Sequence, residues 1–318
     1  MELAPGSYEI QVSKKGYTTD VRKILLAAGE IKNVDVTLVD GDQQPKIVLA
    51  EKDVKEKNQK KIKVWTEPLT EMEFVWIPKG CFMMGSPETE MNRDSDETQH
   101  KVCVDGFWMG RYEVTVKQYS IFISKTRYKG NGENVWGCDG LAKPRFSQEE
   151  NHPVACISWH DAKAFGDWLS NTTKAKHQFR LPTESQWEYA CRAGTQTPFY
   201  FGENINPDIV NYDGNYPYGT AKKGLYREKT TPVGSFPANA FGLFDMHGNV
   251  WEWCQDWYGS YPTTPVTNPG GRPSSGSTRV LRGGSWYYYA QTCRSAERHY
   301  SSSGYRNFYI GLRLSRTP

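Results

Sequence analysis

The sequence predicts a loop-rich α+β domain that follows a small β unit. Helix signals are few, strand signals are short, and long segments rich in Gly, Pro and Asn separate them. This pattern does not favour the alternating strands and helices of a doubly wound sheet. Aromatic residues make up 14% of the 318 residues, and only Tyr8 and Tyr17 among them precede residue 64. Because large rings bury much area from few elements, residues 64–318 are predicted to fold around an aromatic core.

Residues 1–40 are predicted to form the small β unit. Polar and apolar side chains alternate over residues 7–13 and 33–38, as in strands with one buried face. The pattern Leu-x-Pro-Gly-x-Tyr-x-Ile-x-Val over residues 3–12, followed by Gly16 and Tyr17, resembles the PEGA family of surface-associated β modules. That resemblance implies a spacer or interaction module without chemistry of its own.

Residues 41–63 are predicted to be a charged linker. The lysines of this segment could form a patch for nucleic acid or acidic lipid, but the nearby acids Glu51, Asp53 and Glu56 favour a solvated tether. The net charge of +3, with no basic stripe elsewhere in the sequence, argues against a nucleic-acid partner. The apolar runs are strand-sized, so no transmembrane segment is predicted.

Three helices are predicted within residues 64–318. Ser158 is the predicted N-cap of a helix whose apolar face reaches residue 169. Thr183 forms a predicted capping box with Gln186, at the start of a helix that ends near Gly194. The third helix is predicted over residues 115–125, and short strands are expected over residues 73–77, 101–112 and 310–314.

Five ordered motifs span residues 70–315. They read Trp-Ile-Pro-x-Gly with Met-Gly-Ser (76–86), His-Pro-Val with Ser-Trp (152–159), Arg-Leu-Pro-Thr-Glu-x-x-Trp-Glu-Tyr-Ala (180–190), Phe-Gly-Leu-Phe-Asp-Met-x-Gly-Asn-Val-Trp-Glu-Trp (241–253) and Arg-Gly-Gly-Ser-Trp with Gly-Leu-Arg (282–313). Together they closely resemble the formylglycine-generating-enzyme family. This resemblance implies a C-type-lectin-like fold whose two ends lie close together.

The residues that carry the chemistry of this family are incomplete in the sequence. Its oxidase needs two neighbouring cysteines after the Gly-Gly-Ser motif, because thiolates hold copper(I), and residues 286–293 contain only Cys293. Its iron-dependent sulfoxide synthases use His-x-x-x-His-x-Glu, and none of the six histidines has that spacing. We therefore predict that the chain is not an enzyme and has no catalytic cofactor. The alternative is an oxidoreductase of the formylglycine-generating type that acts on a peptide cysteine or a small thiol.

The seven cysteines leave two interpretations open. They are odd in number and at least 18 positions apart, which fits buried free thiols or one or two disulfides. The disulfides of the family are not expected, because the partner position of Cys191 is Leu314 and a second bridge would need a cysteine at Ser295. The fold is therefore expected to depend more on aromatic packing than on cross-links.

The C-terminal segment 286–309 is rich in Tyr and Ser, which are common in antibody paratopes. Its three adjacent tyrosines do not fit a buried strand, in which neighbouring residues point to opposite faces. The segment resembles the variable region of diversity-generating retroelement proteins of this family. The implied fixed frame is Trp286, Ala290, Cys293, Arg294, Ala296, Arg298, Arg306, Ile310, Gly311 and Arg313. The implied variable, ligand-binding positions are Tyr287, Tyr288, Tyr289, Thr292, His299, Tyr300, Ser301, Ser302, Tyr305, Asn307, Phe308 and Tyr309.

This second resemblance implies a receptor- or adhesin-like protein that binds an unknown protein or glycan through a diversified aromatic surface. It also implies a cell-surface or extracellular location, with the signal or lipid anchor outside these residues. The alternative is a loop whose tyrosines only cover the core.

The Asp-Met-x-Gly-Asn-Val-Trp-Glu stretch binds calcium in the family. The resemblance implies a structural calcium ion held by the carboxylates of Asp245 and Glu252 and the carbonyls of Gly248 and Val250. Oxygen-only ligation is what calcium favours. The alternative for Asp245 is a helix cap or an ion pair. A second family site would use Asn211, but no acidic partner for it occurs near residues 224–226.

Overall fold

The computed structural model describes residues 6–13, 20–26, 46–51, 62–134, 137–173, 176–270 and 276–318. The chain divides into two compact units, residues 1–61 and residues 62–318. Within the described residues, no helix is both long enough and apolar enough to cross a membrane.

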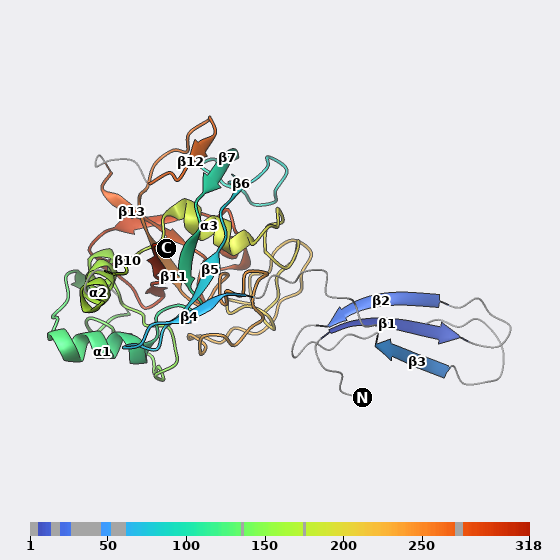
Figure 1. Cartoon of the computed structure of the whole chain (residues 1–318), viewed down its shortest axis with the longest axis horizontal. Helices are drawn as coiled ribbons and strands as arrows, with labels where there is room; N and C mark the ends of the chain where they lie inside the picture. Colours follow the sequence, from blue (N-terminus) through green and yellow to red (C-terminus); the bar gives the residue numbers. More distant parts are fainter. Residues whose placement is uncertain are drawn as a thin grey trace. The chain divides into compact units, whose positions relative to one another are not determined.

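The N-terminal unit contains a three-stranded antiparallel sheet. Its strands are β1 (Gly6–Ser13), β2 (Asp20–Leu26) and β3 (Lys46–Glu51), in the order β2-β1-β3 (Figure 1). β1 confirms the strand predicted over residues 7–13, whereas the strand predicted over 33–38 lies outside the described residues. β3 lies in the segment predicted as a linker, so the end of the β unit predicted at residue 40 is wrong. The apolar run of β3 completes the sheet by pairing with β1.

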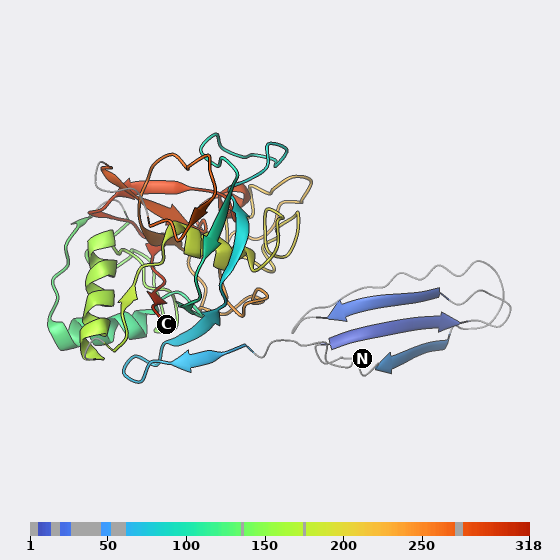
Figure 2. The same cartoon turned by 45° about the horizontal axis from the view of Figure 1, so that its top comes forward.

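All three predicted helices of the main unit are present, and each begins after the predicted kind of cap. The side chains of Thr115, Ser158 and Thr183 each accept a hydrogen bond from the backbone N–H three residues later. The side chain of that later residue in turn accepts from the backbone N–H of the cap, which completes a capping box. The helices are α1 (Val116–Thr126), α2 (Trp159–Thr172) and α3 (Glu184–Arg192). α1 and α2 lie side by side at one edge of the unit in both views (Figures 1 and 2).

A five-stranded sheet joins the two ends of the main unit. Its order is β10 (Phe179–Arg180), β17 (Ser315–Arg316), β8 (Phe107–Gly110), β5 (Glu73–Ile77) and β4 (Val64–Thr66). The first strand of the unit, β4, and the last, β17, thus belong to one sheet (Figure 2). This confirms the expectation that the two ends lie close together.

Three smaller sheets complete the main unit. A four-stranded sheet has the order β14 (His299–Ser302), β13 (Thr278–Arg282), β11 (Trp251–Trp257) and β16 (Ile310–Gly311). A three-stranded sheet contains β12 (Val266–Thr267), β7 (His100–Val104) and β6 (Gly80–Met84), and β15 (Tyr305–Arg306) pairs with β9 (Glu133–Asn134).

Two strand predictions need correction. The strand predicted over residues 101–112 is two strands, β7 and β8, because the chain turns at Asp105 and Gly106. A Cβ atom at Gly106 would lie 2.5 Å from the ring of Trp76, so a larger residue does not fit this turn. The strand predicted over 310–314 is β16 alone, and the following residues instead bond to the segment that leaves β8.

The core combines large rings with buried charged groups. Trp187, Trp251 and Trp253 are fully buried, which confirms the predicted aromatic core. The sequence left open whether the cysteines are buried free thiols or form disulfides, and the structure contains both. Cys81–Cys103 and Cys138–Cys156 form disulfides, and three other thiols are buried and free. Aromatic packing and two cross-links therefore stabilise the fold together, in contrast to the expectation that cross-links are minor.

Candidate functional site

The C-terminal segment 286–309 forms one irregular surface rather than a strand. It leaves β13 through Gly283 and Gly284, continues through a 3₁₀ turn (Ala290–Cys293) and returns as β14 and β15. Gly284 has a φ of +74°, and a Cβ atom there would lie 2.6 Å from the Cys293 Sγ. Glycine is thus required where the segment folds back on itself.

The predicted fixed frame and the predicted variable positions occupy different environments. All ten frame positions, from Trp286 to Arg313, are buried. Of the twelve variable positions, Tyr287, Tyr289 and Tyr300 are 39%, 44% and 47% exposed. Ser302 is also exposed, and four more are half-buried: Tyr288, His299, Ser301 and Tyr305.

The other four predicted contact positions are buried and support the surface from below. Thr292 donates its hydroxyl to the carbonyl of Tyr289, and Asn307 accepts from the backbone N–H of Phe308. Tyr309 receives the stacked ring of Tyr287 at 5.7 Å between centroids and 8° between planes. Thr292, Phe308 and Tyr309 therefore support the exposed Tyr287 and Tyr289 from below.

A neighbouring loop that the sequence prediction missed extends the aromatic surface. Tyr216 and Leu225 are 55% and 59% exposed, and the ring of Tyr216 meets that of Tyr289 edge-on at 5.3 Å. The backbone N–H of Ala290 also donates to the carbonyl of Tyr216. No local pattern in the sequence pairs these residues, because they are more than 70 positions apart.

An aromatic cavity of about 330 Å³ adjoins this surface. Tyr226 stacks on Trp286 in its wall, with 6.2 Å between ring centroids. Tyr287 and Phe308 complete the same wall, so two of the twelve predicted positions line a hollow rather than a flat face.

Buried arginines of the frame fix the segment to the rest of the unit. The Arg294 guanidinium contacts both Glu97 carboxylate oxygens at 2.6 and 2.8 Å, and also bonds Glu297. Burial and the nearby Glu97 and Asp94 carboxylates raise the pKa of Glu297 to about 8. Arg306 pairs in the same way with Asp161, the N3 residue of α2. Such bidentate pairs hold the segment in one geometry.

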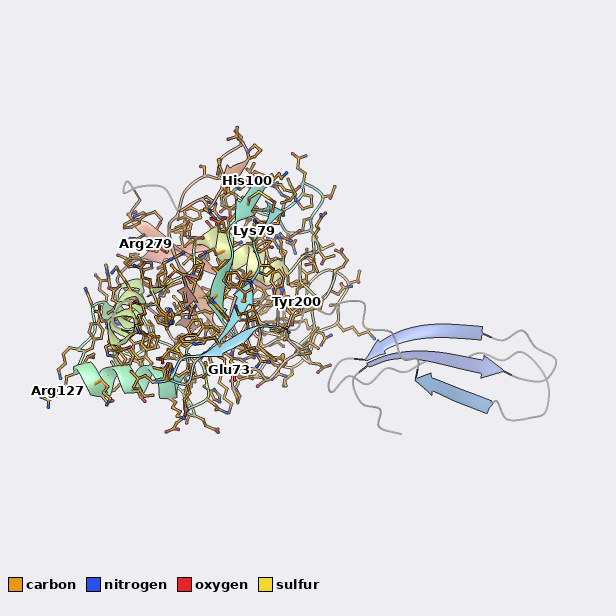
Figure 3. The ribbon with its side chains drawn as sticks, viewed as in Figure 1. Glu73, Lys79, His100, Arg127, Tyr200 and Arg279 are labelled. Carbon is orange, nitrogen blue, oxygen red and sulfur yellow. A yellow bond between two sulfur atoms is a disulfide. The ribbon has the colours of Figure 1, made fainter. Side chains whose placement is uncertain are left out.

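Cys293, whose thiol is free and buried, contacts His247 through its backbone carbonyl, and His247 also contacts Cys191. His247 donates from Nδ1 to the Cys293 carbonyl, while its Nε2 accepts from the backbone N–H of Tyr200, labelled in Figure 3. The Cys191 Sγ lies 3.7 Å from Nε2 of the same ring. Burial raises the pKa of both thiols and lowers that of His247 to about 3, so the imidazole is neutral. Sequence spacing alone does not bring these two cysteines together.

The residues of the predicted calcium site lie in and beside the turn before β11. Asp245 is buried with φ +55°, and Gly248 has φ +80° with its Cβ direction blocked by the Asn211 carbonyl. Within the described residues, Oδ1 of Asp245 has no hydrogen-bond partner, which fits a cation ligand. Glu252 does not fit that role, because its carboxylate accepts from Arg313 and from Trp187 Nε1.

Comparisons with known proteins place this geometry in one family. The Sulfatase-modifying factor enzyme 1-like domain matches residues 60–318. A formylglycine-generating enzyme of Streptomyces coelicolor is 37% identical over 284 residues, covering 74% of this chain and 87% of its own. PvdO of Pseudomonas aeruginosa superposes with a TM-score of 0.72 at 32% identity, covering 81% of this chain and all of its own. Variable protein 1 of Treponema denticola superposes with a TM-score of 0.61 at 26% identity, covering 80% of this chain and 99% of its own.

These findings confirm the predicted loop-rich C-type-lectin-like fold and correct the prediction that the chain is not an enzyme. Relatives named formylglycine-generating enzyme are 27–37% identical to it, so missing family motifs do not remove it from an enzyme family. The chain belongs to the family of the Sulfatase-modifying factor enzyme 1-like domain.

Proposed function

We propose that this chain binds a protein or glycan ligand through the aromatic surface of residues 286–309. The observation that carries the proposal is the separation of environments, with every frame position buried and Tyr287, Tyr289 and Tyr300 exposed. Exposed tyrosines held by a rigid base supply amphipathic contact area at low entropic cost. The likeness to variable protein 1 of Treponema denticola, at 26% identity over 80% of the chain, supports the same proposal.

The ligand surface in this proposal has a rim and a hollow. Tyr216 extends the exposed apolar area beside Tyr289, and the cavity next to Tyr287 offers a recess. Binding sites of this kind concentrate their affinity in a few aromatic anchors within or beside such recesses. Tyr287 is therefore the first anchor to test.

Two experiments test the proposal. The whole chain is applied to a glycan array and to a phage-displayed peptide library, and each hit is measured again with Tyr287, Tyr289 and Tyr300 changed to Ser. The matched control is Leu69→Ser, which changes an exposed apolar residue in the β4–β5 turn. Binding that is lost in the triple variant and kept in the control supports the proposal. Hits that all survive the triple variant contradict it.

Diversification of the surface is part of this proposal. We expect sibling chains from related isolates to differ at the twelve variable positions and to keep the ten buried frame positions. Changes at the eight exposed or half-buried positions should leave folding intact, because surface substitutions change stability little. The four buried positions, Thr292, Asn307, Phe308 and Tyr309, should accept fewer residue types. Siblings that are identical at all twelve positions would contradict this part.

We also propose that the chain acts in an oxidising compartment at the cell surface or outside the cell. The Cys81–Cys103 and Cys138–Cys156 disulfides support this location, because disulfides persist in such compartments. Labelling of the chain on intact cells by a membrane-impermeant reagent tests it. A chain that is labelled only after lysis contradicts it.

The second candidate function is oxidation of a peptide cysteine or a small thiol. Its support is the 37% identity to a formylglycine-generating enzyme and the buried contacts of His247 with Cys191 and with the Cys293 carbonyl. Soft thiolate ligands suit copper(I). Burial raises the pKa of the Cys191 and Cys293 thiols and so favours their protonated form, and binding of copper would require both thiols to lose a proton. Copper bound in a one-to-one ratio, with oxygen uptake on a cysteine peptide that Cys293→Ser abolishes, would favour this candidate over pure binding.

A further inference from the structure

The aromatic cavity beside the proposed ligand surface is built from three separate parts of the chain. Its volume of about 330 Å³ is at the small end of ligand pockets, so the cavity suits a small head group rather than a whole peptide or glycan. Its lining includes five aromatic side chains, which are Phe146 before α2, Tyr226 in the loop between α3 and β11, and Trp286, Tyr287 and Phe308 of the C-terminal segment.

The rings of the cavity are set in two directions, like the walls of a box. Tyr226 and Trp286 are nearly parallel, with 26° between their planes. Phe146 meets Trp286 at 85° with 5.4 Å between centroids, and Tyr287 meets it at 79° with the same separation. Phe308 in turn meets Tyr287 at 82° and 5.1 Å. This is the geometry of an aromatic cage, in which electron-rich ring faces attract a cation.

Close packing holds the inner wall of the cavity in place. Gly137 has a φ of +90°, and a Cβ atom there would overlap the ring of Phe308, so only glycine lets this loop approach the ring. Phe308 is 5% exposed and packs on Trp286 with 5.3 Å between centroids. Binding in a preformed cavity costs less conformational entropy than binding that must first order its walls.

One carboxylate of the lining has no basic side chain as its partner. Glu228 lines the cavity and is exposed, and its side chain makes no ion pair or hydrogen bond within the residues that the structure describes. Arg145, the other charged residue of the lining, already has a partner, because its Nε lies 2.8 Å from Asp139 Oδ1. Arg227 and Lys229 flank Glu228 in the sequence but do not line the cavity. The lining therefore favours a cationic occupant.

The walls also favour one kind of cation. A primary ammonium group has three N–H donors, which lose their water partners in such a cavity and find poor replacements on ring faces. A quaternary ammonium group has no N–H to satisfy, and its methyl groups pack against the rings while its charge attracts the carboxylate. An aromatic cavity with a single unpaired acid therefore selects a methylated ammonium group.

We propose that this cavity binds a methylated ammonium group of the ligand, with Glu228 as its counter-ion. The proposal rests on the proposed binding function of the neighbouring surface and names the chemistry that the ligand must carry there. Tyr287 and Phe308 belong to the twelve variable positions, whereas Phe146, Tyr226 and Glu228 lie outside the C-terminal segment. Sibling chains with other residues at these two positions should therefore lose the preference for this group.

The test compares choline with dimethylbutanol, the neutral isostere in which a carbon atom replaces the nitrogen. Each probe is titrated against the whole chain, and binding is followed by NMR through the broadening of the methyl signal of the probe. We expect choline to bind at least about tenfold more tightly, because ring faces and a carboxylate attract only the charged probe. Equal affinities, or no binding of either probe, would overturn the proposal.

Two variants assign the preference to the cavity. Phe146→Leu keeps apolar volume but removes a ring, and Glu228→Gln removes the counter-ion. Each should weaken choline binding about fivefold or more and change dimethylbutanol binding by less than about twofold. The matched control is Glu88→Gln, which changes an exposed glutamate outside the cavity and should leave both affinities unchanged. Native choline affinity in both cavity variants, or an equal loss in the control, would overturn the proposal.

Two sources of the group are then compared, a trimethyl-lysine peptide and a glycan that carries phosphocholine. Each is measured against its unmodified form and in competition with choline. A preference for the modified form in either pair supports the proposal and identifies the source, and no preference in both pairs contradicts it.

Failure of this proposal is distinguishable from failure of the proposed function. If array or library hits require the exposed tyrosines but choline does not bind, the surface binds its ligand and the cavity proposal is wrong. If choline binds as expected but every hit survives the triple variant, the cavity proposal holds and the proposed function is wrong. Tyr300→Ser, which changes the surface but not the cavity lining, should retain choline binding.

Discussion

Arg313 and Glu252 form a fully buried ion pair, with Nη2 2.7 Å from Oε1 and Nε 3.0 Å from both carboxylate oxygens. Glu252 lies on β11 and Arg313 follows β16, the strand that pairs with β11. The pair therefore connects two of the five sequence motifs and fixes the end of the C-terminal segment to the core.

Breaking this pair should cost far more than breaking an exposed one. We expect Glu252→Gln to lower the free energy of unfolding by about 3–5 kcal/mol, because it leaves the Arg313 charge buried and unpaired. Urea unfolding measures the effect. The control is Asp139→Asn, which breaks the exposed pair with Arg145 and should cost less than about 1 kcal/mol. Equal losses in both variants would contradict the assignment.

The tryptophans of the scaffold should dominate packing stability. Trp187 is fully buried and donates Nε1 to Glu252 at 2.7 Å, so Trp187→Ala should cost about 3–5 kcal/mol and leave a cavity. Trp251→Ala, also in the core, should cost a similar amount. Thermal unfolding checks both, and an unchanged Tm in either variant would show that the ring does not support the fold.

Stability should fall as the pH rises through the neutral range, because of Glu297. Its folded pKa is raised to about 8 from an ordinary value of 4.5, mainly by burial. The nearby Arg294 opposes this rise in the pKa, but burial outweighs it, and the Glu97 and Asp94 charges add to the rise. Between pH 4.5 and about pH 8 the folded state therefore binds more protons than the unfolded state, so raising the pH favours unfolding.

The Glu297→Gln variant isolates this contribution. Tm measured from pH 5 to pH 9 should fall less steeply in the variant than in the native chain. A pH-dependent difference in stability of about 1.4 kcal/mol between the native chain and the variant corresponds to a folded pKa one unit above the ordinary value. Parallel pH profiles would mean that Glu297 does not titrate in this window.

Variable positions should divide into two classes by their effect on stability. Tyr289→Ser changes a ring that is 44% exposed, and we expect a change within about 0.5 kcal/mol. Phe308→Ser removes a buried ring that packs on Trp286 at 5.3 Å, and we expect a loss of about 3 kcal/mol or more. Chemical unfolding of the two variants gives both values. Similar values would contradict the division into contact and support positions.

Local signals explain why parts of the fold could be predicted from the sequence. The caps Thr115, Ser158 and Thr183 act within four residues, so their helices can be predicted from short windows. The break between β7 and β8 could not, because it depends on Gly106 facing the distant ring of Trp76. β3 was missed for a similar reason, since its strand character depends on pairing with β1.

The candidate site shows the same limit. The sequence by itself determined the family, the three helices and the twelve candidate contact positions, because motifs and composition are local properties. Only the tertiary structure decided that Phe308 supports the surface while Tyr216 extends it, and that Glu113 is buried rather than in open solvent. Burial and charge compensation depend on contacts between residues far apart in the chain, such as the bond between Asn249 and Glu113.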